Sequence, residues 1–349
     1  MYRKGMCLLL VYVNDFVISG PELQAHKYFK EISNVIKLGD VGILQEILGL
    51  QVKFDFKHST RTLFIGQAQY AHSIVERYIM NNKYKNVLKK ANTPTIDVPN
   101  VESECEPGVN GDTARKHIGA LLYLCRCTRP DISFEVGRLG RYVTSWTVEA
   151  DKRLHRVFEY VNSTLEYGLY VAVPESSFGN ITIVAAADAD HGGCPETRRS
   201  TSGWIVQLYD IKKNMYLATI SWGSKLQSSG AKSTGEAEVT ALNDLLCRDL
   251  MPIEILYEAM YGDKVITKIL DDSNAASGAV LGANRSRLRY MAKQPGIRLS
   301  FLRDAMADPC REVHRVDTAD NTADMFTKGL QKAAFERHRA SALVGPMPL

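Results

Sequence analysis

Four carboxylates in the second half of the chain lie in or beside apolar segments, and they constrain the fold more than any other feature. Their positions are Asp188, Glu238, Asp272 and Asp324. Burying a carboxylate costs free energy unless a partner compensates its charge, so a solvated acid is not expected in such surroundings. The pattern therefore makes the four side chains candidates for a functional site.

The first of these acids continues the apolar row of a predicted strand. The sequence ITIVAAADAD predicts a β-strand at residues 181–190, because small and β-branched residues dominate it. Side chains alternate between the two faces of a strand, so Ala186, Asp188 and Asp190 share a face. An alternative stays open, in which Asp188 only ends the strand and opens the turn HGG at 191–193.

The second acid is a choice between two glutamates. Ser233 and Glu236 have the spacing of a capping box, which assigns Glu236 a structural role at the start of a helix. Glu238 has no such role and shares the helix face of Ala241 and Leu245. An unpaired carboxylate on an apolar face is unfavourable, so Glu238 is the stronger candidate for a functional site.

The third and fourth acids follow a predicted strand and lie in a predicted helix. The sequence VITKILDD at 265–272 predicts a strand that ends at Asp272, and an N-cap of the helix after it is the structural alternative. Asp324 lies in the segment DNTADMFTK, where we expect a short helix capped by Asp320. Taken alone, Asp324 has the pattern of a solvated helix residue. The order of the four acids along the chain carries the functional hypothesis.

Longer sequence motifs around the acids resemble one known family. They are RRSTSGW at 198–204, ISWGSKLQ at 220–227, STGEAEVTAL at 233–242 and NTADMFTKGL at 321–330. Together, and in this order, they resemble the ribonuclease H domain of copia-like retrotransposon Pol polyproteins. The resemblance implies an α/β fold, with a ribonuclease H-like domain at 176–335 that contains a mixed five-stranded sheet flanked by helices.

The same resemblance implies a chemistry for the acids. It matches Asp188 to the family's first-strand aspartate and Glu238 to its helix glutamate. It matches Asp272 and Asp324 to the two later aspartates. Four converging carboxylates repel one another unless cations neutralise them, and hard oxygen ligands suit Mg²⁺ or Mn²⁺. We therefore expect a metal-dependent nuclease with two ions, and the resemblance implies that it cleaves the RNA strand of an RNA–DNA hybrid.

The upstream half resembles other parts of the same polyprotein. Residues 125–145 resemble the segment that joins polymerase and ribonuclease H, and residues 39–52 and 64–78 resemble the end of the copia-type reverse transcriptase. We expect a truncated reverse transcriptase palm and thumb remnant at 1–95, a helical connection segment at 96–175 and a frayed tail at 336–349.

One departure from the family lies near the start of the chain. The sequence LLLVYVNDFVISG at 8–20 resembles the palm hairpin of a polymerase, whose tip normally carries two adjacent aspartates, but here the pair is Asn14-Asp15. Polymerase metal ions need anionic oxygens, and a neutral amide supplies only a dipole. We expect Asn14 and Asp15 to form a degenerate polymerase site without reverse transcriptase activity.

The charge distribution permits a polyanionic partner. The net charge is +4 and the sequence pI is near 8.5, which is mildly basic. A late segment gathers six basic residues, Arg285, Arg287, Arg289, Lys293, Arg298 and Arg303. A solvated helix face is the simplest interpretation of such a run, but beside a nuclease centre it favours a phosphate-binding groove. The residues that we expect to contact nucleic acid are Arg198, Arg199, Lys293 and Arg298.

A second departure concerns histidines. In the segment KQPGIRLSFLRD at 293–304, Gln294 and Ser300 stand where the family usually has histidine. The nearby His314 lies on a predicted strand, where a histidine more often has a structural partner than a role in proton transfer. We therefore assign no general acid.

Composition bears on the compartment. The seven cysteines include no Cys-x-x-Cys pair, which indicates a reduced intracellular chain without a zinc site. The apolar run at 6–13 is interrupted by Asn14-Asp15, so we expect a buried strand and no signal peptide. No stretch is long enough to span a membrane. The oligomeric state stays open.

Two functional interpretations remain. The intact set of four acids favours an active ribonuclease H. Asn14 and the truncated polymerase favour a non-catalytic remnant or a nucleic-acid-binding module.

Overall fold

The chain divides into two compact units, Met1–Lys53 and Phe54–Leu349. The computed structural model describes residues 2–39, 42–56, 59–83, 86–96, 106–273, 278 and 299–347. The first unit contains β1 (Tyr2–Lys4), β2 (Cys7–Tyr12), β3 (Asp15–Ser19), α1 (Glu22–Ser33) and β4 (Glu46–Ile47). Strand β5 (Leu50–Asp55) spans the division between the units.

The first unit contains the hairpin that its sequence predicts. Strands β2 and β3 pair antiparallel with Tyr12 opposite Asp15, so Val13 and Asn14 form a two-residue turn. Val13 has a φ of 52°, in the left-handed region that tight hairpin turns require. Asn14 therefore lies at the hairpin tip, and Asp15 is the first residue of β3.

The second unit contains a layer of helices with a core of its own. These are α2 (Ala68–Asn81), α3 (Ala114–Cys127), α4 (Ser133–Leu139) and α5 (Val148–Ser163), with 3₁₀ turns η1 (Pro130–Ile132) and η2 (Gly140–Tyr142) around α4. In this core the ring of Tyr78 stacks on that of Phe158, with 3.9 Å between centroids. The helices α3 to α5 fall in the segment that the sequence predicts to be a helical connection.

The same segment ends in a strand that the sequence analysis did not anticipate. Strand β7 (Gly168–Pro174) is followed by the turn η3 (Glu175–Ser177). It pairs antiparallel with β6 (Thr60–Gly66) on one side and with β13 (Val344–Gly345) on the other. Gly168 lies opposite Gly66, where a Cβ at Gly168 would come within 2.4 Å of the Ile65 carbonyl oxygen. Only glycine allows this close pairing of the two backbones.

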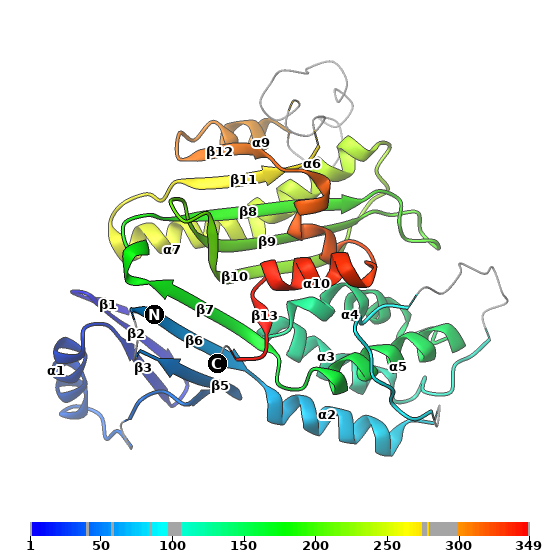
Figure 1. Cartoon of the computed structure of the whole chain (residues 1–349), viewed down its shortest axis with the longest axis horizontal. Coiled ribbons are helices and arrows are strands. Elements are labelled where there is room, and N and C mark those ends of the chain that lie inside the picture. Colours follow the sequence, from blue (N-terminus) through cyan, green and yellow to red (C-terminus); the bar gives the residue numbers. More distant parts are fainter. Residues whose placement is uncertain are drawn as a thin grey trace. The chain divides into compact units, whose positions relative to one another are not determined.

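A mixed five-stranded sheet forms the centre of the second unit, as the resemblance implies (Figure 1). Its order is β10-β9-β8-β11-β12. The strands are β8 (Ile181–Asp190), β9 (Thr201–Asp210), β10 (Met215–Leu226), β11 (Thr267–Asp271) and β12 (Arg311–Arg315). Strands β8, β9 and β10 are antiparallel neighbours, whereas β11 is parallel to both β8 and β12. The carboxyl ends of β8 and β11 therefore lie at the same edge of the sheet.

Different segments cover the two faces of this sheet. One face packs against α6 (Thr234–Leu245), the π-helical turn Leu246–Leu250, α7 (Met251–Tyr261) and α9 (Leu299–Met306). The other packs against the 3₁₀ turn η7 (Thr322–Phe326), which η6 (Thr318–Asp320) precedes. In β8, Ala185 and Ala187 belong to the first core and Ala186 to the second. The predicted alternation along this strand is therefore confirmed.

The end of the chain is not frayed as far as residue 347, so that expectation is wrong. Helix α10 (Lys332–Ser341) and β13 cover part of the sheet instead. Ala342 and Val344 are buried there, and the side chain of Gln207 donates a hydrogen bond to the Ser341 carbonyl at 2.8 Å. Thr219 Oγ1 donates to the Ala342 carbonyl at 2.7 Å. The apolar residues after α10 gain a core position, which offsets the entropy of ordering a terminus.

None of the helices in the described part of the chain combines the length and the hydrophobicity that crossing a lipid bilayer requires.

Candidate metal centre

Asp188 lies near the carboxyl end of β8, and the residue is only 4% exposed. Its partner across the sheet is Gly203 on β9. A Cβ on Gly203 would lie 2.6 Å from Thr327 Cγ2 and 2.8 Å from Phe326 Cβ, so the missing side chain lets this segment pack directly on the strand. Thr327 Oγ1 then donates a hydrogen bond to Asp188 Oδ2.

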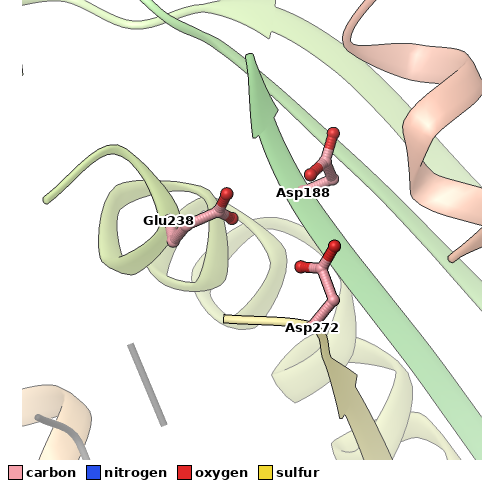
Figure 2. Close-up of side chains that lie close together, drawn as sticks. All are labelled: Asp188, Glu238 and Asp272. Atoms are coloured by element: carbon pink, nitrogen blue, oxygen red, sulfur yellow. The ribbon is translucent and has the colours of Figure 1, made fainter. Parts of the chain in front are cut away.

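The start of α6 separates the roles of its two glutamates. Ser233 Oγ accepts a hydrogen bond from the backbone N–H of Glu236 at 3.2 Å. The Glu236 carboxylate in turn accepts one from the backbone N–H of Lys232 at 2.8 Å, so it belongs to the helix cap as predicted. Glu238 is buried, 7% exposed, and its carboxylate points toward Asp188 (Figure 2).

Asp272 follows directly after β11, and its carboxylate lies with those of Asp188 and Glu238 (Figure 2). One carboxylate oxygen from each of the three residues lies within 4.8 Å of the others. The local turn role belongs to Asp271, whose side chain accepts the backbone N–H of Ser273 at 2.9 Å. The helix expected to start at Ser273 and Asn274 falls on 274–277, outside the described residues.

The fourth acid, Asp324, lies in η7 and is 6% exposed, so it is not a solvated helix residue. The expectation that Asp320 caps this helix is wrong. The cap is Asn321, whose Oδ1 accepts the Ala323 N–H at 3.1 Å and whose Nδ2 donates to the Ala187 carbonyl at 3.0 Å. This second bond ties η7 to β8. A buried amide that can both donate and accept suits this position, whereas a carboxylate can only accept.

Crowding of these acids disfavours their charged forms. Burial, and then the charge of Asp324, raises the pKa of Asp188 to about 6. Burial, and then the charges of Asp188 and Asp272, raises the pKa of Glu238 to about 9. The pKa of Asp272 is raised by burial and by Asp188. A cluster of this kind is stabilised either by protons or by bound cations.

The donor set fits a divalent cation. All the candidate ligand atoms are carboxylate oxygens, which are the ligands that Mg²⁺ and Mn²⁺ prefer. In addition, Asp324 Oδ1 is buried and has no hydrogen-bond partner within the described part of the chain. An unpartnered anionic oxygen beside three crowded acids is the environment that a cation would satisfy.

Sequence reasoning missed two neighbours of the acids. Lys328 Nζ lies 2.9 Å from Asp324 Oδ2 and 4.0 Å from Asp188 Oδ2. Thr327, described above, holds Asp188 from the same segment. The sequence did contain a signal for Lys328. It follows Asp324 at the i,i+4 spacing that places two side chains together on a helical turn. Asp190, at the end of β8, is half-buried, and burial raises its pKa.

The candidate nucleic-acid residues are only partly within the described structure. Arg198 and Arg199 are exposed in the turn after β8, which closes through backbone hydrogen bonds to Cys194. Lys293 and Arg298 lie outside the described residues, as does Gln294. His314 has a partner on its own strand, with Nε2 2.8 Å from the Glu312 carboxylate.

Comparison with known sequences decides the family. No family model matches the chain. It is 26% identical over 342 residues to the retrovirus-related Pol polyprotein from transposon TNT 1-94 of Nicotiana tabacum, covering 96% of this chain and 24% of that protein. It is 30% identical over 235 residues to an uncharacterized mitochondrial protein of Arabidopsis thaliana, covering 67% of this chain and 89% of that protein.

The chain belongs to the copia-type retrotransposon Pol polyproteins. It spans about a quarter of the length of the Nicotiana tabacum polyprotein that it matches.

Two solved structures are similar to parts of this copia-type chain. One is LC11-RNase H1 in complex with an RNA/DNA hybrid, with 17% identity, 42% of this chain and 93% of that chain covered, and a TM-score of 0.29. The other is the foamy viral protease-reverse transcriptase in complex with an RNA/DNA hybrid, with 12% identity, 89% of this chain and 36% of that chain covered, and a TM-score of 0.46.

The raised pKa of Glu238 predicts a pH-dependent stability of the metal-free protein. A carboxyl group whose pKa is about 9 when folded and about 4.3 when unfolded binds more protons in the folded state. Its stabilising contribution is complete below the unfolded pKa and is lost as the pH rises toward the folded one. In EDTA, we expect Glu238→Gln to be more stable than the wild type at pH 8 and to lose this advantage toward pH 5.

Melting temperatures between pH 5 and pH 9 measure this difference. Glu236→Gln is the matched control, since it alters a carboxylate of the same helix that serves the cap. A stability difference between wild type and Glu238→Gln that stays constant across this pH range would contradict the crowded-acid geometry.

Proposed function

We propose that this chain contains a ribonuclease H-type centre that hydrolyses the RNA strand of RNA–DNA hybrids with the help of divalent metal ions. The observation that carries the proposal is the convergence of Asp188, Glu238 and Asp272 at one edge of the central sheet. Family membership in the copia-type Pol polyproteins supplies the substrate class. The activity is of the hydrolase class, and the reaction is endonucleolytic.

In this proposal the four acids would bind two Mg²⁺ or Mn²⁺ ions. Asp188, Glu238 and Asp272 would hold the first ion, and Asp188 together with Asp324 would hold the second. Such ions, when bound, activate the attacking water and stabilise the leaving 3′ oxygen at phosphorus. Thr327 fixes Asp188 through its hydrogen bond, and Asn321 fixes the segment of Asp324 against β8.

Substrate contacts would come from basic side chains, two of which lie in the turn after β8. Arg198 and Arg199, exposed after β8, are proposed to contact backbone phosphates, together with Lys293 and Arg298. Recognition of the RNA strand would depend on its 2′-hydroxyl groups in the minor groove of the hybrid. Neither the proposed metal centre nor these basic residues would need to contact a particular base.

Residues 1–95 are proposed to be a reverse transcriptase remnant without activity. Asn14 stands at the hairpin tip, where a polymerase needs a carboxylate, and Asp15 alone is left to bind metal. A non-catalytic remnant or nucleic-acid-binding module is the second candidate function for the whole chain. The observation that favours it is this same Asn14, which supplies a neutral amide at the hairpin tip where the resemblance leads us to expect an aspartate.

Cleavage of a labelled RNA–DNA hybrid tests the proposal. We expect Mg²⁺- or Mn²⁺-dependent cleavage that falls about a hundredfold or more in Asp188→Asn and in Glu238→Gln, because each substitution removes an anionic ligand. Glu236→Gln is the control, and it should keep most of the activity, since the amide oxygen can still accept the Lys232 N–H. Equal losses in the two glutamine variants would mean that the cap, and not Glu238 itself, supports the site.

Primer extension tests the remnant. We expect no nucleotide incorporation on any template by the wild type, because Asn14 supplies a neutral amide where polymerase metal ions need an anionic oxygen, and we expect none by Asn14→Asp. A labelled primer on RNA or DNA template, resolved on a denaturing gel, measures incorporation. Extension by either protein would show that the first unit retains polymerase function.

A further inference from the structure

Lys328 places a positive charge directly at the acidic cluster. Its Nζ lies 2.9 Å from Asp324 Oδ2 and 4.0 Å from Asp188 Oδ2. The side chains of those two acids are 8% and 6% exposed, whereas that of Lys328 is 39% exposed. The ammonium group therefore contacts two buried acids although the Lys328 side chain as a whole stays partly exposed.

Two hydrogen bonds to β8 fix the backbone segment that leads to Lys328. Asn321 donates to the Ala187 carbonyl, and Thr327 donates to Asp188. Both ends of the segment 321–327 are therefore anchored on β8, and Lys328 follows directly after the second anchor. The backbone N–H of Lys328 also donates to the Asp324 carbonyl at 3.3 Å. The contact between Lys328 and the acids thus follows from the backbone path and not from a free side chain that settles on a charged surface.

Lys328 does not satisfy the acids that it contacts. Among the residues that the structure describes, none forms a hydrogen bond with the buried Asp324 Oδ1, whereas Oδ2 contacts the lysine. One ammonium charge faces two carboxylates, and its distance to Asp188 is long for a hydrogen-bonded ion pair. A divalent cation between Asp188 and Asp324 would supply the second charge and could engage the unused oxygen, but it would have to share this space with Lys328.

We propose that Lys328 is a resident cation that occupies the second metal position, so that metal loading is ordered. The first ion binds at Asp188, Glu238 and Asp272, and the second binds between Asp188 and Asp324 only when the ammonium group moves out to solvent. Lys328 is thus a positioning residue that sets the affinity of the second site. The inference rests on the proposed function for the identity of the two sites.

The test is a Mn²⁺ titration of the full chain without nucleic acid, with free Mn²⁺ followed by electron paramagnetic resonance. For the wild type we expect a tight class of site and a much weaker one. In Lys328→Met, which keeps the length of the side chain but removes its charge, the weak class should tighten about tenfold or more, because a like charge a few ångströms away is gone. The tight class should change much less. Lys328→Arg keeps the charge and should keep the weak class weak.

Lys212→Met is the matched control for loss of a positive charge. Lys212 follows Asp210, which pairs with Ile181 at the opposite end of β8, so it lies roughly 20 Å from Asp188. This control should leave both classes unchanged. Lys328→Gln is a second neutral variant and should repeat the result of Lys328→Met if the latter folds poorly, as melting in EDTA would show.

A weak class that is unchanged or weaker in both neutral variants, or a single class in every protein, would overturn the inference. A protein that binds Mn²⁺ in two classes as expected but does not cleave hybrid would overturn the proposed function and leave the role of Lys328 intact. The titration contains no substrate, so the two failures are distinguishable.

Discussion

The electrostatic repulsion among the carboxylates that meet at one edge of the sheet is the constraint that the rest of the second unit must offset. Strand β11 runs parallel to β8, so the residues at their carboxyl ends, Asp188 and Asp272, meet at that edge. Helix α6 adds Glu238 from the adjacent face. Asp188 and Glu238 are buried and Asp272 is half-buried, and the raised pKa values of Asp188 and Glu238 express the unfavourable free energy of their charged forms.

The surrounding structure holds the acids in place but does not remove the repulsion between them. Gly203 lets the segment of Thr327 and Phe326 approach β8, and the buried apolar residues around Phe326 join that segment to the end of the chain. Asn321 adds a hydrogen bond to β8. Stability from this packing offsets the repulsion between the acids, which is the usual relation between a rigid scaffold and a site built for chemistry. A substitution that neutralises one acid should therefore increase the free energy of unfolding of the metal-free protein.

Much of this arrangement could be predicted from the sequence, because local patterns determine it. The run ITIVAAADAD has a period of two, and β8 spans the predicted residues 181–190. The capping box at Ser233 and Glu236 marks the start of α6, and the apolar face of that helix points to Glu238 as the buried acid. Sequence order together with the family motifs then linked acids that lie far apart along the chain.

The remainder depends on tertiary contacts that no local pattern encodes. The sequence of the last residues predicts a frayed terminus, because the groups that anchor them, strand β7 and the side chains of Gln207 and Thr219, are far away in sequence. Asp320 and Asn321 are both good caps, and the Ala187 carbonyl selects Asn321. Asp324 appears solvated in sequence because the surface that buries it comes from the sheet. The spacing of Lys328 from Asp324 is visible in the sequence, but its approach to Asp188 also depends on the sheet.

The most direct measurement of the central claim compares melting of the wild type and Asp188→Asn, each in EDTA and in Mg²⁺. If the acids crowd one cation site, Asp188→Asn should melt a few degrees higher than the wild type in EDTA, a gain on the order of 1 kcal/mol. It should also lose part of the further stabilisation that Mg²⁺ gives the wild type by mass action. Identical melting of the two proteins in EDTA, together with no response of the wild type to Mg²⁺, would contradict a shared metal centre.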